Sequence, residues 1–466
     1  MTAQQRWFAS DNNASTHPLI MEALARANSG HAVGYGDDPV TQKAEAAVAA
    51  LFRTPHQDAE PLVRFVLNGT GANVYALGCL AGHGDAIFCS DCAHIMVDET
   101  GAPTAVTGAQ IVPLPSTDGK LSARALAHAV HEWSDMHKAK PTVLSLSQPT
   151  ELGTVYSHSE LSQLCGTAHR LGMSVHIDGA RLANAAAALG CSPAEAAGDA
   201  DVVCFGGTKN GLMFGEAVVF MPAILEKLGD TARLRKTRLQ LASKMRYIAA
   251  QFLEYLHNDL WLSNAMHANA MAARLADGAR KLGLSIQYPV QANGLFVRVN
   301  ASVADELKAN AFFYDWEGGL VRWMASWDTT EEDVDSFLQK LAQALKARQS
   351  KGPARSEAET EALHAELLEK RLWLKADWNC VDSRVSDQSL GYPSPPFTQP
   401  VLKGTATIEL PDTLSLQLGN KTIAQCVRQR KSRRAYSSAS INLTELSYLL
   451  WSCAGVREAK AKYAFR

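Results

Sequence analysis

The sequence lacks several features that would assign a protein to a class at once. It contains no run of about 18 apolar residues, so no membrane-spanning helix is expected. Its first residues lack the apolar core of a signal peptide. The formal net charge of −2 gives no general attraction to nucleic acid or to an anionic membrane. We therefore expect a cytoplasmic protein that acts on a small molecule.

The nine cysteines do not form the pattern of a metal site. Cys89 and Cys92 have the CxxC spacing, but neither a second pair nor a matching histidine cluster completes a zinc site. We therefore expect no metal and interpret the cysteines as free thiols in a reducing compartment. Internal repeats are also absent from the sequence.

Composition and length indicate a large folded protein. Hydrophobic residues make up 47% and charged residues 20% of the 466 residues, which favours an extensive core over disorder. At roughly 150 residues per domain, the length suggests about three domains.

Short β-rich runs alternate with helical stretches between residues 62 and 220. This alternation predicts an α/β fold with a mostly parallel sheet and helices on both faces. The runs are residues 62–67, 85–88, 110–114, 142–146, 174–177, 202–205 and 216–220. We assign residues 1–255 to this large domain, including an N-terminal arm.

A smaller αβ unit is predicted for residues 256–346, after a mainly helical stretch. Its last helix is amphipathic, with apolar residues on one face and acidic residues in the first turn. The polar residues 347–358 then form a predicted linker. Residues 359–466 are a separate C-terminal segment.

Two charged residues follow two of the β-rich runs. Asp178 ends the run at 174–177, and Lys209 follows the run at 202–205 within a stretch of glycine and threonine. Pyridoxal 5′-phosphate needs this pair, because a lysine forms a Schiff base with it and a carboxylate keeps its ring nitrogen protonated. The two residues therefore predict a catalytic pair.

A glycine-rich turn provides a candidate site for the cofactor's phosphate. Gly69, Thr70 and Gly71 follow a predicted strand and begin a helical stretch, where backbone N–H groups bind anions well. A purely structural tight turn explains such a sequence equally well. Thr208 is a candidate for an additional phosphate hydroxyl, and a helix N-cap is the alternative.

Three further residues are candidates for the site. His94 lies between the phosphate turn and Asp178 in the chain, where its ring could lie on a face of the cofactor; a loop histidine is the alternative. Arg181 and Arg322 could each hold an amino-acid carboxylate through a guanidinium fork. For Arg322, a surface arginine on an edge strand is the alternative.

These motifs together resemble low-specificity L-threonine aldolases, a family of fold type I (aspartate-aminotransferase-like) pyridoxal enzymes. The resemblance covers about residues 7–346. It rests on the sequences His94-Ile-x-x-Asp-Glu99-Thr-Gly-Ala, His176-Ile-Asp178-Gly-Ala-Arg181-Leu, Thr208-Lys209 and Tyr35-Gly-Asp-Asp38-Pro. It implies homodimers or homotetramers whose active sites are shared between subunits, and the loop of Tyr35 would join such a shared site.

The resemblance also implies roles for individual residues. Ser10 would hold the substrate carboxylate together with Arg181 and Arg322. His137 would lie near the substrate hydroxyl, and Gln148 would contact the cofactor ring oxygen.

The resemblance implies the cleavage of L-threonine and L-allo-threonine to glycine and acetaldehyde. His94, His137 or an ordered water would remove the proton of the β-hydroxyl. The alternatives on the same fold are β-elimination and transamination.

The C-terminal segment has a different resemblance. Arg430, Ser432 and Arg434 resemble the FMN-phosphate motif at the start of a nitroreductase-type (SagB-like) flavin domain. A solvated basic helix end is the alternative. The segment is about half the size of such a fold, so FMN is expected only if another chain completes it. A flavin-binding redox protein or a scaffold is therefore the alternative function from another class.

Overall fold

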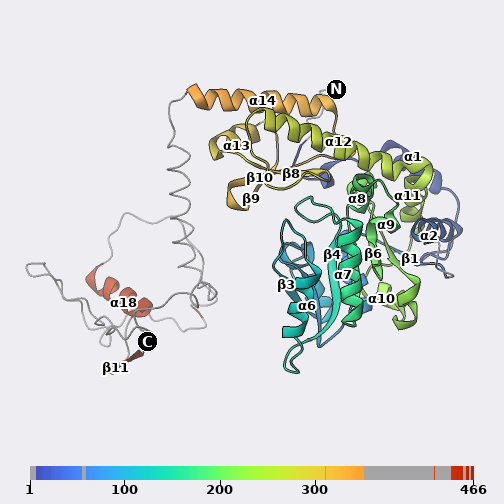
Figure 1. The fold of residues 1–466 in the computed structure, drawn as a ribbon, viewed down its shortest axis with the longest axis horizontal. Coiled ribbons are helices and arrows are strands. Elements are labelled where there is room, and N and C mark those ends of the chain that lie inside the picture. Colours follow the sequence, from blue (N-terminus) through green and yellow to red (C-terminus); the bar gives the residue numbers. More distant parts are fainter. Residues whose placement is uncertain are drawn as a thin grey trace, which may run out of the picture. The chain divides into compact units, whose positions relative to one another are not determined.

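The computed structural model of the chain (Figure 1) describes residues 7–54, 59–309, 311–350, 425, 442–454, 458–460 and 463–465. The chain divides into two compact units, Met1–Ala354 and Arg355–Arg466. In the second unit, the described elements are helix α18 (Leu443–Ala454) and the antiparallel strands β11 (Glu458–Lys460) and β12 (Tyr463–Phe465). Arg430, Ser432 and Arg434 lie outside the described residues.

A seven-stranded sheet forms the centre of the first unit. Its strand order is β1-β7-β6-β5-β4-β2-β3. Strands β6, β5, β4, β2 and β3 are parallel, whereas β7 is antiparallel to both β6 and β1. The strands are β1 (Leu62–Val66), β2 (Asp85–Ser90), β3 (Gln110–Leu114), β4 (Lys140–Ser147), β5 (Ser174–Gly179), β6 (Val202–Gly206) and β7 (Glu216–Phe220). The predicted α/β fold with a mostly parallel sheet is thus confirmed.

Helices surround this sheet, and side-chain caps fix where several of them begin. Ser157 and Glu160 form a reciprocal capping box at the start of α7. The helices of the large domain are α1 (Pro18–Ala27), α2 (Pro39–Phe52), α3 (Gly69–Leu80), α4 (His94–Val97), α5 (Ala102–Thr107), α6 (Ala123–Glu132), α7 (His158–Arg170), α8 (Leu182–Leu189), α9 (Pro193–Ala197), α10 (Thr231–Thr237) and α11 (Arg246–Leu256). Short 3₁₀ turns are η1 (Asp11–Asn13), η2 (Thr208–Asn210), η3 (Pro222–Lys227) and η4 (His257–Asp259). Among the described residues, no helix is sufficiently long and apolar to cross a membrane.

A smaller antiparallel sheet follows the long helix α12 (Leu260–Lys281). Its strand order is β8-β10-β9. The elements are β8 (Gly294–Arg298), α13 (Ala301–Lys308), β9 (Tyr314–Trp316), η5 (Glu317–Gly319), β10 (Leu320–Met324) and α14 (Glu331–Ser350). The apolar face of α14 is buried through Val334, Phe337 and Leu341, and the ring of Phe337 packs edge-on against that of Trp323.

The N-terminal arm joins this smaller unit. Phe8 is buried, its ring lies 4.8 Å from that of Phe337, and its carbonyl accepts a hydrogen bond from the Met324 backbone. The backbone N–H of Phe8 donates to the Phe312 carbonyl. These contacts fix the position of the residues that come next, Ser10 and Asp11.

The sheet topology determines where a ligand site can lie. The parallel strands β4, β5 and β6 all end at one edge of the sheet, and ligands of open α/β sheets bind beyond such carboxyl ends. Strand β1 also ends at this edge, because it is antiparallel to β7, which is itself antiparallel to β6. The turns that follow these four strands therefore converge.

Candidate active site

A pocket lies at this edge of the sheet and collects residues from all four turns. It is lined by Gly69, Thr70, Asn73, His94, Glu99, Ser147, Pro149, Glu151, Asp178, Ala180, Arg181 and Lys209. The predicted residues Gly69, Thr70, His94, Asp178, Arg181 and Lys209 thus line one cavity, although more than 100 residues separate some of them in the chain.

Asp178 is buried at the end of β5 and both of its carboxylate oxygens accept hydrogen bonds. Asn73 Nδ2 donates to Oδ2 at 2.8 Å, and the Ala180 backbone N–H donates to Oδ1 at 3.1 Å. Burial alone would raise the pKa of Asp178, but the charge of Lys209 and the Asn73 amide outweigh it, and the pKa lies below its ordinary value. The carboxylate therefore stays ionised and can hold a cationic group.

A chain of polar contacts links Asp178 to His94. Asn73 Nδ2 also donates to Glu99 Oε1 at 2.9 Å, and His94 Nδ1 lies 3.0 Å from the same Glu99 oxygen. The hydrogen bond to Glu99 raises the pKa of His94. The Glu99 side chain is fully buried, whereas that of His94 is 37% exposed, so the imidazole reaches the pocket while Glu99 orients it from behind.

Lys209 lies in the 3₁₀ turn η2 that follows β6. Two hydrogen bonds hold this turn: Asn210 Nδ2 donates to the Tyr255 hydroxyl at 2.7 Å, and the Gly207 N–H donates to Glu216 Oε2 at 2.8 Å. Burial, reinforced by the charge of Arg181, lowers the pKa of Lys209. A larger fraction of its amine is therefore neutral and nucleophilic than in an exposed lysine.

The Thr208 hydroxyl makes a structural contact, and its contact with the cofactor phosphate stays a prediction. Its Oγ1 accepts a hydrogen bond from the Gly215 N–H at 3.1 Å and so closes the turn that carries Lys209. The N-cap of η2 is Gly207, so the alternative interpretation of Thr208 as a helix N-cap is wrong.

The glycine-rich turn between β1 and α3 forms one end of the pocket. Asn68 caps α3 by accepting a hydrogen bond from the Gly71 N–H at 2.7 Å. The side chain of Gln240 crosses this turn: its Oε1 accepts from the Leu67 N–H at 3.0 Å, and a Cβ on Gly71 would lie 2.4 Å from its amide. A side chain at position 71 would therefore displace the Gln240 amide from this turn.

The two arginines differ in what they already bind. Arg181 grips the buried Asp11 with Nε at 2.6 Å and Nη2 at 2.8 Å. Arg322 Nη2 donates to the Ala9 carbonyl at 3.1 Å, beside Ser10, and its guanidinium lies 5.2 Å from the ring centre of Tyr314 and 5.3 Å from that of Trp316. Arg322 Nε is buried without a partner among the described residues. Arg322 therefore retains hydrogen-bonding capacity for an added carboxylate, with Ser10 nearby, although the residues that line the pocket include Arg181 and not Arg322.

Two predicted residues lie elsewhere. His137 is exposed in the loop before β4, at the strand's amino end. Since a strand rises about 3.3 Å per residue, the eight residues of β4 separate His137 from the pocket edge by about 26 Å. Gln148 is buried with its side chain on backbone groups: Nε2 donates to the Tyr156 and Ala196 carbonyls, and Oε1 accepts from the Tyr156 N–H. The structure therefore places neither His137 nor Gln148 at the pocket of this chain.

Several pocket residues escaped the sequence analysis. Asn73 and Glu151 line the cavity, Asp11 holds Arg181, which also lines it, and Gln240 binds the Leu67 N–H just before the glycine-rich turn. Glu99 stands within one of the quoted motifs, and Asp11 directly follows Ser10; these positions were the signals in the sequence. For Gln240 no local pattern exists, because its contact is with a turn about 170 residues earlier.

Comparison with known proteins agrees with this geometry. The model of the beta-eliminating lyase family matches residues 8–302. A low specificity L-threonine aldolase of Pseudomonas aeruginosa is 42% identical over 340 residues, which cover 72% of this chain and 96% of that protein. Its counterpart from Saccharomyces cerevisiae is 28% identical over 302 residues, 64% of this chain and 74% of that protein.

Solved structures show the same fold. The threonine aldolase of Leishmania major superimposes with a TM-score of 0.68 at 30% identity, covering 72% of this chain and 98% of that one. The aspartate aminotransferase of Thermus thermophilus, at 16% identity and a TM-score of 0.53, covers 71% and 89% and shares the fold alone. These comparisons do not support the resemblance of residues 359–466 to a flavin domain. Through the match over residues 8–302, this chain belongs to the beta-eliminating lyase family, and its architecture is that of the fold type I enzymes that use pyridoxal phosphate.

Proposed function

We propose that this protein cleaves L-threonine and L-allo-threonine to glycine and acetaldehyde with pyridoxal phosphate. The observation that carries the proposal is the meeting of Lys209, Asp178 and the Gly69–Thr70 turn in one pocket. The names of the relatives from P. aeruginosa and S. cerevisiae support the same reaction.

The residues of the pocket fit the cofactor. Lys209 would bond its aldehyde carbon, ionised Asp178 would hold its ring nitrogen, and the N–H groups at the start of α3 would bind its phosphate. Gln240, whose amide lies against this turn, would add a polar contact there. When bound, pyridoxal phosphate supplies an electron-accepting ring that weakens the bonds at the α-carbon of an amino acid.

The protein's own residues would select and orient the substrate. Ser10 and Arg322 would bind the α-carboxylate, since Arg322 Nε has no partner in the described part of the chain and two aromatic rings keep its guanidinium in place. Arg181, held by Asp11, would add its positive charge to the binding of the same carboxylate. His94 would lie against the cofactor, with Glu99 fixing its ring orientation.

We also propose that the active enzyme is a homodimer or homotetramer. An apolar groove between α1, the turn after Lys209 and the start of α11 includes the half-exposed Met21, Met213 and Phe214. Tyr35, at the tip of the neighbouring loop, is 51% exposed. A second copy of the chain would cover these surfaces, which a lone soluble subunit would leave in water. Cytoplasmic location suits the free thiols of Cys89 and Cys204.

The test is a product assay with L-threonine, L-allo-threonine and the two D-isomers side by side. We expect acetaldehyde and glycine in equal amounts from both L-isomers and neither product from the D-isomers. A keto acid formed without acetaldehyde would instead assign the pocket to β-elimination or transamination. Gel filtration with light scattering tests the oligomer, and a monomer at micromolar concentration would contradict that part.

A further inference from the structure

A second carboxylate faces the pocket besides Asp178. Glu151 follows β4 and is partly exposed to the cavity that it lines. Its Oε1 accepts two hydrogen bonds, from Ser147 Oγ at 2.6 Å and from the His94 backbone N–H at 2.8 Å. Its Oε2 has one partner among the described residues, the Cys92 thiol at 4.0 Å, which is a weak contact. Oε2 therefore retains its capacity to accept a proton.

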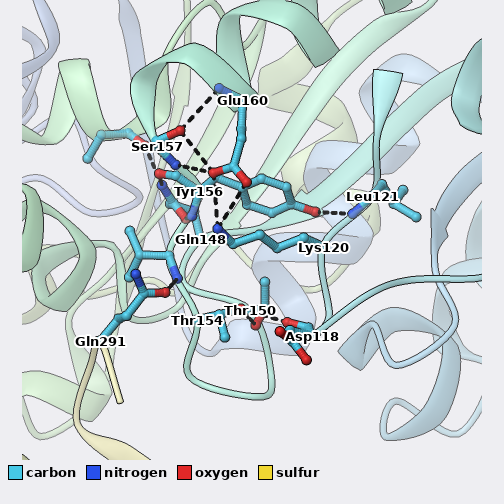
Figure 2. Close-up of polar contacts among 12 residues, drawn as sticks. Asp118, Lys120, Leu121, Gln148, Thr150, Thr154, Tyr156, Ser157, Glu160 and Gln291 are labelled. Atoms are coloured by element: carbon cyan, nitrogen blue, oxygen red, sulfur yellow. Dashed lines mark hydrogen bonds and ion pairs between the residues drawn. The ribbon is translucent and has the colours of Figure 1, made fainter. Parts of the chain in front are cut away.

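The loop that carries Glu151 is fastened on both sides, as Figure 2 shows. Gln148 binds the backbone of Tyr156 through two hydrogen bonds, and the Tyr156 hydroxyl accepts from the Leu121 N–H at 2.7 Å. Between these points, the hydroxyls of Thr150 and Thr154 lie 2.7 Å apart. The backbone of Glu151 is thus held in place. A side chain that acts on a bound substrate needs such a fixed position.

The other groups at the pocket are less suited to accept a proton. Both oxygens of Asp178 already receive hydrogen bonds, and its ionised form is needed for the cofactor. His94 Nδ1 is engaged by Glu99, so only its Nε2 could accept a proton, and its ring is the one proposed to lie against the cofactor. Burial raises the pKa of Glu151, which makes its carboxylate a stronger base than an exposed glutamate.

We propose that Glu151 is the general base that removes the proton from the β-hydroxyl of the substrate. This role rests on the proposed aldol cleavage and replaces the one expected of His137. As Oε2 takes the proton, the O–H electron pair becomes the second bond of the aldehyde carbonyl, and the Cα–Cβ bond breaks. The electron pair of that bond stays with the glycine half, whose α-carbon then gains one proton. Glu151 releases its proton before the next turnover, so the overall reaction neither consumes nor produces one.

The test compares two reactions in the variant Glu151→Gln, loaded with cofactor. The amide keeps the size of the side chain and an oxygen for Ser147 and His94, but it cannot take a proton. The first reaction is cleavage of L-allo-threonine, measured as acetaldehyde. The second is exchange of the glycine α-proton with deuterium from heavy water, measured by NMR, which involves no hydroxyl. Cofactor affinity, from a fluorescence titration, and melting temperature show whether the site is intact.

General bases contribute about 10²- to 10⁴-fold, so we expect cleavage to fall by at least about 100-fold. Glycine exchange and cofactor affinity should stay within about threefold of the wild type. Equal losses in both reactions would overturn the proposal, because Glu151 would then only position His94. Cleavage within about threefold of the wild type would overturn it as well.

A second variant gives an independent result. In Glu151→Ala, added formate should raise cleavage at least about tenfold by supplying a carboxylate in the vacated space, and should leave glycine exchange unchanged. No gain with formate would contradict the proposal. A wild-type protein that exchanges the glycine proton but releases no acetaldehyde would instead show that the proposed cleavage itself is wrong. The role proposed for Glu151 would then be wrong as well.

Discussion

Replacement of Asp178 by asparagine removes the negative charge of the side chain and keeps its size. The Asp178 carboxylate accepts from Asn73 Nδ2 and from the Ala180 N–H. An asparagine keeps one acceptor oxygen for Ala180, but its amide then faces the Asn73 amide. Asn73 can turn over, since its Oδ1 is buried and unpaired among the described residues, but then Glu99 loses the hydrogen bond at 2.9 Å. The change therefore also weakens the hold on Glu99, the residue that orients His94.

Two terms set the size of the effect on catalysis. Two unit charges at about 4 Å, in an effective dielectric constant of about 20, attract by about 4 kcal/mol. At about 1.4 kcal/mol per factor of ten, losing this attraction to the cofactor ring slows turnover by about 10³-fold. The lost hydrogen bond to Glu99 adds about 1 kcal/mol and hence somewhat less than a further factor of ten. We expect a total loss of about 10³- to 10⁴-fold.

The assay is acetaldehyde release from L-allo-threonine at saturating cofactor, with cofactor affinity measured separately. Affinity should fall far less than turnover, because the phosphate turn is untouched. Asp201→Asn is the matched control: Asp201 accepts from the Val175 N–H at the opposite end of the same strands, so its loss should leave turnover unchanged. A rate for Asp178→Asn within about tenfold of the wild type would refute the reasoning and require another acid at the ring nitrogen.

Other variants test the remaining parts of the site and the tail. Lys209→Ala should abolish turnover and the visible absorbance of the bound cofactor with the fold intact; turnover with the band retained would contradict the assignment of this lysine. Asp11→Asn should raise the KM for threonine at least about tenfold with little change in cofactor affinity, because Arg181 loses its charged partner; an unchanged KM would mean that Arg181 is held by other contacts. Residues 1–350 should match the full chain in turnover and melting temperature, because the buried face of α14 closes the smaller unit without later residues; an inactive or much less stable fragment would show that the C-terminal segment packs on the enzyme.

Two of the predicted site residues follow from the sequence with little tertiary information. Asp178 stands directly after one short apolar run and Lys209 shortly after another, and the alternation with helical stretches indicates that these runs are buried parallel strands. Their carboxyl ends must then meet at one edge of the sheet. Pattern and chain order were therefore sufficient to bring these residues to one pocket.

Other parts of the site were decided by tertiary contacts. Periodicity gives the direction of a side chain inside a strand, but not where the strand ends, and the pocket is built from strand ends, helix starts and the loops between them. Gln148 turns inward because Tyr156 and Ala196 offer it backbone partners, and His137 precedes β4 and so lies at the wrong end of the strand. Gln240 and Asp11 reach their partners across about 170 residues of sequence, and no local pattern encodes such a distance.

The sequence by itself determined the α/β class, the strands and the chemistry of the lysine–aspartate pair, because these depend on local hydrophobic patterns and on the types of a few residues. Only the tertiary structure decided that Asp11 holds Arg181, that Asn73 and Glu99 connect Asp178 to His94, and that Glu151 lines the same pocket. These contacts join side chains from different turns. Their geometry exists only after the sheet has brought the ends of its strands together.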